Sequence, residues 1–365
     1  MKEKLHPFHI CLLVYMNQSG VVLFALPRLL AQETGYNGWV TILIYSAMAT
    51  FNIWLISVVY RLSKGKSIFV IIEQALPKVF IIPLYTFLVS LWTLTGCLIA
   101  KQYVIIFQTF VFPTTHPMFI KFLVDFLAFL LISKGIYNIA KAATSFFWIL
   151  IWLLLLLLYF IKDFEWVNMT PFFFHEHSPN VLVGGLTVYS AFLGYELAIL
   201  LFPYVEKGKR FIKSVYLANV MVTLSYLAVC VVCFGLYSFN QLKRLSYPVI
   251  DLLAQISFPF VERIETFTFS MFIFTNLISI TFYIWAAKEA VLRVVPKING
   301  NWITAVLISA AYAVSWIPDV LSKVEAWLTF LGITEIAIAF GLPLLLIVIL
   351  LLRKGEKESC ITDYD

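Results

Sequence analysis

Two short polar segments interrupt long apolar stretches of this sequence, and they hold its best candidates for binding chemistry. The first reads Asn17-Gln18-Ser19-Gly20 between two apolar runs. Asn, Ser and Gly are poor residues for a helix interior, because their side chains or backbones favour other conformations. An unwound backbone inside a membrane-length stretch must face protein or a wet cavity. We therefore expect Ser19 and Gly20 to border a binding site.

The second interruption places Leu193, Gly194 and Glu196 in the middle of another apolar stretch. A charged side chain at that depth costs roughly 3 kcal/mol on insertion scales, and such residues are usually functional. Half-helix N-termini suit a carboxylate, whereas half-helix C-termini present carbonyls that suit an ammonium group or a cation. An amino acid carries both groups. The alternative is that these glycines only allow close helix packing.

Other polar residues fall within apolar stretches and could line the same site. Ser279 and Tyr283 are four residues apart, so they share one face of a helix, and Thr95 lies in a third stretch. We consider all three as pocket residues. Hydrogen bonding between helices, which Ser and Thr make routinely, remains an equal alternative.

Three further charged residues, Lys101, Asp125 and Glu335, also lie within apolar stretches. An unpaired ammonium in a membrane should pair or lose its proton. We expect a Lys–carboxylate pair among these residues, as a structural ion pair or as part of a proton or ion relay.

The sequence offers no catalytic constellation. It has no nucleophile elbow, no phosphate-binding Gly-rich loop and no HExxH motif. His175-Glu176-His177 lacks a third metal ligand at suitable spacing. We predict no enzyme activity, no cofactor and no metal site.

The elements that must position these residues are transmembrane helices. Of the 365 residues, 62% are apolar and 13% are charged, about half the charged fraction of a soluble domain. With about 20 apolar residues to a span, the sequence predicts an all-α membrane protein with ten transmembrane helices. They lie near residues 9–31, 37–60, 82–111, 118–135, 143–161, 181–204, 214–238, 264–287, 302–317 and 328–352.

The interruptions fall in the first and sixth of these helices, which divides ten helices into two sets of five. Because five is odd, the second set starts from the opposite side and is inverted. We expect a single transmembrane domain over 1–352, with repeats at about 9–161 and 181–352 and a tail at 353–365. Interrupted helices at corresponding positions of two repeats indicate a transporter-type binding site.

The basic residues predict the orientation. With the N-terminus inside, 18 of the 26 Lys and Arg residues fall in cytoplasmic segments, as the positive-inside rule requires. Both termini are therefore expected in the cytoplasm. The net charge of +6 comes from short clusters between apolar runs rather than a basic stripe, so we expect the lipid bilayer and not nucleic acid as a partner.

Several motifs resemble the B subunits of GerA-type spore germinant receptors, which belong to the amino acid–polyamine–organocation superfamily. They are Gly20 to Arg28 with Thr34-Gly35 and Gly38-Trp39, Phe192 to Glu196 with Pro203, Tyr247 to Leu253 with Glu262 to Phe267, and Trp316 to Asp319. They span nearly the whole chain in the expected order. Asn17-Gln18 departs from the family, which often has small residues there.

The resemblance implies a LeuT-like fold and the spore inner membrane as the location. It also implies partnership with an A subunit and a lipoprotein C subunit, and nutrient sensing that leads to germination with early cation release. By the same motifs the pocket positions would be Gly20, Thr95, Leu193, Ser279 and Tyr283.

Two functions remain in view. The chain is either a receptor subunit, in which a small nutrient such as an amino acid shifts a conformational equilibrium, or an amino acid permease that works by alternating access. Both would use one fold, and only the family motifs favour the receptor.

Overall fold

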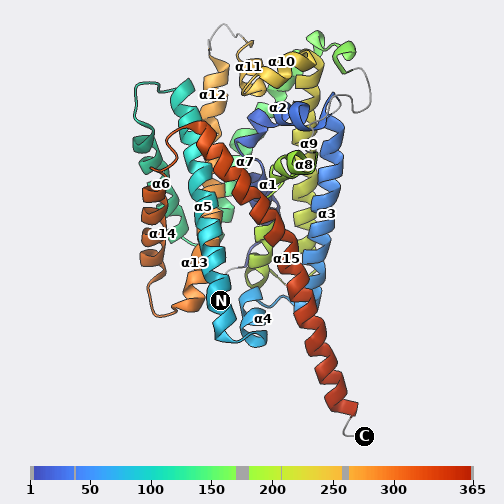
Figure 1. Cartoon of the computed structure of the whole chain (residues 1–365), viewed down its shortest axis with the longest axis vertical. Helices are drawn as coiled ribbons and strands as arrows, with labels where there is room; N and C mark the ends of the chain where they lie inside the picture. Colours follow the sequence, from blue (N-terminus) through green and yellow to red (C-terminus); the bar gives the residue numbers. More distant parts are fainter. Residues whose placement is uncertain (1–3, 37, 170–180, 207, 257–262, 363–365) are drawn as a thin grey trace.

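The structure, a computed structural model, describes residues 4–36, 38–169, 181–206, 208–256 and 263–362. These residues are almost entirely helical, and the only β-type contact among them is an isolated bridge between Leu5 and Val205. Figure 1 shows the long helices running along the length of the molecule, with α15 crossing its front diagonally.

The long helices contain enough apolar residues to cross a membrane. Among the described residues, six helical stretches meet that criterion: Gly38–Ser63 (α3), Lys78–Phe110 (α5), Ile136–Asp163, Arg210–Leu236 (α9), Ile264–Val294 and Leu321–Arg353. The stretch from Ile136 combines α7 (Ile136–Leu150) with the 3₁₀ helix η1 (Ile151–Asp163). Together with the bent pair described next they confirm a polytopic membrane fold, whereas the number of ten spans stays a prediction.

The first interrupted helix is broken where the sequence predicts it. Helix α1 (Pro7–Gln18) ends, three residues follow, and α2 (Val22–Thr34) leaves at an angle of 56°. Ser19 and Gly20 therefore lie in the break. Together α1 and α2 have the length and composition of one span.

The second interruption is also present. Helix α8 (Val181–Ser190) ends in a series of turns, after which the 3₁₀ helix η3 (Glu196–Tyr204) begins. Gly194 lies in these turns with φ 118°, which a residue with a side chain rarely adopts. Both predicted breaks are thus part of the fold.

The other expected segments correspond to helices with shifted ends. Expected segment 118–135 is α6 (Pro117–Ser133), segment 264–287 is α12 (Ile264–Met271) with α13 (Ile273–Val294), and segment 302–317 is α14 (Gly300–Val314). Helix α15 (Leu321–Thr362) continues as a helix into the segment that we expected to be a tail from residue 353.

Short helices connect the long ones. Figure 1 shows α4 (Ile68–Ala75) at the lower end of the molecule and α10 (Phe239–Arg244) and α11 (Pro248–Leu253) at the upper end. Helix α15 also ends at the lower end of the molecule. Another short 3₁₀ helix, η2 (Trp166–Met169), follows η1.

Helices α5 and α13 pack against each other over much of their length, and a glycine lets them approach closely. A Cβ added to Gly96 of α5 would lie 3.3 Å from side-chain atoms of Tyr283 and Ile284 in α13. Small residues let helix backbones approach in this way. The contact brings Thr95, the neighbour of Gly96, beside the face of α13 that carries Ser279 and Tyr283.

Candidate functional site

A cavity of about 250 Å³ lies against both helix breaks. The break between α1 and α2, the end of α8, and helices α5, α13 and α15 supply its walls. The residues that line it are Asn17, Gln18, Gly20, Val21, Val22, Ala25, Arg28, Leu29, Thr95, Ile99, Gln102, Thr187, Ser190, Ala191, Leu193, Tyr247, Ser279, Tyr283, Glu325, Leu328, Thr329, Gly332 and Glu335. This volume suits a small organic molecule.

The cavity is elongated along α15. Glu325 and Glu335 both line it, and ten residues of α-helix correspond to about 15 Å. Glu325 lies with Arg28 and Tyr247 in the cavity wall, whereas Glu335 lies with Tyr283, next to the breaks.

Six of the residues that the sequence singled out lie in the wall of this cavity: Gly20, Thr95, Leu193, Ser279, Tyr283 and Glu335. The structure thus brings together residues from helices α5, α13 and α15 and from both breaks.

The other four candidates lie outside the wall. Ser19 donates a hydrogen bond to the carbonyl of Tyr15 at 2.7 Å and borders a smaller hollow of about 40 Å³. Gly194 and Glu196 lie behind the wall, where they hold the second break in shape. Lys101 is on α5, but only its neighbours Ile99 and Gln102 reach the cavity.

Side chains of the first break satisfy backbone groups of the second. The amide nitrogen of Asn17 donates to the carbonyl of Gly194 at 2.7 Å, and that of Gln18 donates to the carbonyl of Phe192 at 2.7 Å. These carbonyls have left a regular helix and need partners. Asn17 and Gln18 therefore link the two breaks.

A tyrosine of α9 also links the breaks. The hydroxyl of Tyr226 lies 2.9 Å from the carbonyl of Gln18 and 2.9 Å from the carbonyl of Ala191. Tyr226 is fully buried. One phenol group thereby bridges the end of α1 and the turns after α8.

Gly194 is required by geometry as well as by its φ angle. A Cβ at this position would lie 2.8 Å from the side-chain nitrogen of Asn17 and 2.9 Å from its carbonyl oxygen. The backbone N–H of Gly194 donates to the carboxylate of Glu196 at 2.6 Å. Glu196 therefore stabilises the turn that contains Gly194.

The carboxylate of Glu196 is further tied to α13. Its second oxygen accepts a hydrogen bond from the hydroxyl of Tyr283 at 3.1 Å. On the same face of α13, Ser279 donates to the carbonyl of Asn17 at 3.3 Å. The pair spaced by four residues thus contacts both breaks, one residue to each.

In contrast to Glu196, Glu335 has a hydrogen-bond partner for only one of its two carboxylate oxygens among the described residues. One of its oxygens accepts a hydrogen bond from the indole of Trp92 at 3.2 Å. The other oxygen is buried and has no hydrogen-bond partner among the described residues. A buried carboxylate oxygen in this position is costly unless something donates to it.

Glu335 is one of several cavity residues with such an atom. The acceptor oxygens of Asn17 and Gln18 and the hydroxyl of Thr95 are also buried without a partner in the described part of the chain. These atoms are mainly acceptors. A ligand that carries N–H groups would satisfy them.

The expected pair between Lys101 and a carboxylate is wrong. Asp125 forms its ion pair with Lys121, one turn away on α6, and Glu335 bonds Trp92. The ammonium of Lys101 lies 3.2 Å from the sulfur of Met118. The four-residue spacing of Lys121 and Asp125 on one helix face favours their pairing over a pairing between helices.

No cluster of His, Cys, Asp and Glu suited to a metal ion occurs within the described ranges. His175-Glu176-His177 lies outside them. The contacts made by Trp92 and Tyr226 were missed by the sequence analysis, because an aromatic residue inside an apolar helix carries no signal of its partner.

Comparison with known proteins identifies the family of this chain. The family model described as "Spore germination protein" matches residues 4–324. The chain belongs to this family. The match covers most of the chain, including both breaks and every site residue predicted from the sequence except Glu335.

Curated relatives confirm the resemblance to germinant receptor B subunits. The chain is 22% identical to spore germination protein GerQB of Bacillus cereus, with 91% of each chain covered. It is 23% identical to spore germination protein B2 of Bacillus subtilis, with 86% of each covered. It is 26% identical to spore germination protein YndE of the same species over 95% of this chain and 96% of the relative.

Solved structures confirm the LeuT-like fold. A nucleobase-cation-symport-1 family transporter, in a closed conformation with bromovinylhydantoin bound, superposes with a TM-score of 0.69 at 11% identity, covering 95% of this chain and 78% of the other. MhsT in complex with L-phenylalanine superposes with a TM-score of 0.68 at 14% identity, covering 96% of this chain and 89% of the other.

Proposed function

We propose that this protein is the nutrient-sensing membrane subunit of a spore germinant receptor, and that it binds an amino acid at the two helix breaks. The observation that carries the proposal is the cavity of about 250 Å³ between the breaks, with its buried acceptor atoms. The membership of the spore germination family supplies the biological context.

The chemistry of the cavity supports a zwitterionic ligand. The free oxygen of Glu335 and the side-chain oxygens of Asn17 and Gln18 suit an ammonium group. The N-terminal residues of α2, Val21 and Val22, also line the cavity. A helix N-terminus favours a carboxylate.

The links between the breaks support a sensing mechanism. A ligand can shift a conformational equilibrium only through different affinities for the two states. A ligand bound between Gly20 and Leu193 contacts both breaks, which Asn17, Gln18 and Tyr226 hold together. Its binding would favour one spacing of the breaks over another, and α13 and α15 would transmit the change.

In this proposal the A subunit and the lipoprotein C subunit read the change, and cation release and germination follow. The chain lies in the spore inner membrane with both termini in the cytoplasm. No enzymatic step is involved.

The alternative is an amino acid permease. The fold favours it, because one of the structural neighbours is a transporter. Uptake of radiolabelled amino acids by proteoliposomes that contain only this chain distinguishes the two functions. The receptor proposal predicts binding without concentrative uptake, and uptake that responds to an ion gradient would contradict it.

A further inference from the structure

A second cavity, of about 540 Å³, lies between the ends of α3 and α9, away from the helix breaks. Four cationic side chains line it: Arg61 and Lys64 from α3 and the residues after it, and Lys209 and Lys213 from the start of α9. No acidic residue lines it. We call this cavity the basic pocket.

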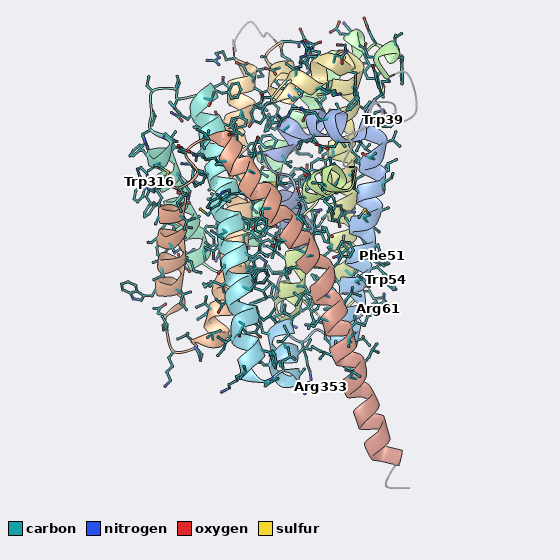
Figure 2. The ribbon with its side chains drawn as sticks, viewed as in Figure 1. Trp39, Phe51, Trp54, Arg61, Trp316 and Arg353 are labelled. Atoms are coloured by element: carbon teal, nitrogen blue, oxygen red, sulfur yellow. The ribbon has the colours of Figure 1, made fainter. Side chains whose placement is uncertain are left out.

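The positive-inside rule explains why cations are found at this end of the molecule, but it does not explain why they converge on a hollow. The two pairs of cations lie almost 150 positions apart in sequence, and the packing of α3 against α9 brings them together. Lys64 has φ 53°, in the left-handed region, so the chain turns there as α3 ends. Figure 2 shows Arg61 toward the lower part of α3, with Trp39 at the upper end of that helix.

The remaining walls of the basic pocket are Ser57, Tyr60, Gly208, Ile212 and Tyr216. Tyr60 is held in place, because its hydroxyl accepts a hydrogen bond from the N–H of Gly208 at 3.3 Å. The nearest acidic residue in sequence, Glu206, lines an adjoining hollow beside Leu5 and Pro7, which shares Gly208 and Lys209 with the basic pocket. The basic pocket therefore combines a cationic rim with aromatic and apolar walls.

The basic pocket continues into apolar faces of its two helices. Trp54 lies seven residues before Arg61 and Val220 seven residues after Lys213, so each shares the pocket-side face of its helix. Both side chains are exposed. In a membrane protein such exposed apolar faces contact acyl chains.

We propose that the basic pocket binds the anionic headgroup of a membrane phospholipid, with an acyl chain lying along Trp54 and Val220. A phosphate group is negatively charged and accepts charge-assisted hydrogen bonds from Lys and Arg side chains, so these four cations favour it. Basic pockets between transmembrane helices recognise such headgroups. The apolar surface beside the pocket favours a lipid over a free phosphate ion.

Native mass spectrometry of the purified full chain tests this proposal, with phosphatidylglycerol and phosphatidylcholine added in equal amounts. We expect phosphatidylglycerol to be retained in preference to phosphatidylcholine. The variant K64Q/K213Q should weaken this retention about 30-fold, since each cation near an anionic headgroup contributes roughly fivefold. The variant K64R/K213R keeps the charge and should retain the lipid.

The matched control is K134Q/K297Q, which removes two exposed lysines from other loops at the same expected side of the membrane. It should leave retention unchanged. Equal retention of the two lipids, or equal loss in both glutamine variants, would overturn the proposal. Displacement of the lipid by millimolar inorganic phosphate would also overturn it, since the occupant would then be the free ion.

Discussion

Gly194 shows how one residue fixes the shape of the site. Its φ angle excludes most side chains, and a Cβ would collide with the backbone of Asn17. Glu196 caps the N–H of the same residue. The turn therefore depends on the absence of a Cβ at Gly194 and on the buried carboxylate of Glu196.

Gly194→Ala should destabilise the protein by about 3 kcal/mol, because strain and collision add. The matched control is Gly135→Ala. Gly135 also has positive φ, but a Cβ there meets nothing within 4 Å, so only strain of about 1–2 kcal/mol applies. Thermal unfolding in detergent measures the difference, and an equal loss in both variants would mean that the contact with Asn17 is not tight.

Glu335→Gln tests whether the free oxygen of Glu335 binds an ammonium group. Glutamine keeps the shape and an acceptor for Trp92 but removes the charge. We expect at least a tenfold rise in the amino acid concentration needed for germination, because a charged hydrogen bond contributes about 1.5–3 kcal/mol. The exposed carboxylate of α4 supplies the control, Glu73→Gln, which should germinate normally. A normal response of Glu335→Gln at normal protein level would exclude this carboxylate from the site.

At the scale of elements, the coupling of the two breaks depends on a few side chains between helices. Tyr226 of α9 bonds carbonyls at the end of α1 and in the turns after α8. The hydroxyl of Tyr15 in α1 lies 3.0 Å from the hydroxyl of Ser225 in α9 and contacts neither break. The two tyrosines are both buried, and they differ in whether they contact the second break.

Tyr226→Phe should lower stability by about 1–2 kcal/mol, since it leaves two carbonyls short of a partner. It should also reduce the response to every nutrient alike, because it changes the link between the breaks and leaves the cavity wall intact. Tyr15→Phe should have a smaller effect on germination. Dose–response curves for several amino acids would contradict this account if Tyr226→Phe changed the response to one nutrient alone.

The elements were largely predictable, and the contacts between them were not. Mid-span Ser19-Gly20 and Gly194 indicate breaks because such residues are poor in helices, and the structure has breaks at both positions. The pairing of Lys101 was predicted wrongly. The length of an apolar segment indicates how deep a residue lies in the membrane, but not the direction in which its side chain points. For the same reason the sequence did not show that Trp92 would meet Glu335.

The residues of the candidate site could be predicted where they lie on a regular helix, because their spacing shows which of them share a face. Ser279 and Tyr283 share a face by their spacing, and that face meets the breaks. Ser19 is one residue from Gly20 but faces the smaller hollow. The direction of a residue in an unwound segment follows no period, so sequence could not distinguish these two neighbours.

At the scale of the whole molecule, the expected orientation rests on the charge count. Cys360 is the one cysteine in the segment after residue 352, and the other four, Cys11, Cys97, Cys230 and Cys233, are buried. A membrane-impermeant maleimide should therefore label Cys360 in inside-out vesicles and not in intact cells. Cys360→Ser should abolish the signal, and labelling in intact cells would reverse the orientation.

The central claim is that the cavity between the helix breaks is where the nutrient binds. Gly20 lies in its wall, and a Cβ there meets no atom within 4 Å. Gly341 of α15 is equally open but lies outside the cavity. Alanine at either position should be accepted by the fold.

Binding of radiolabelled amino acids to the purified chain, compared between Gly20→Ala and Gly341→Ala, therefore tests the claim most directly. We expect both variants to unfold at the temperature of the unmodified protein. Gly20→Ala should weaken binding of the larger amino acids about tenfold, as an added methyl group overpacks the cavity by about 1–3 kcal/mol, and Gly341→Ala should bind normally. Unchanged binding by Gly20→Ala across the whole panel would contradict the claim.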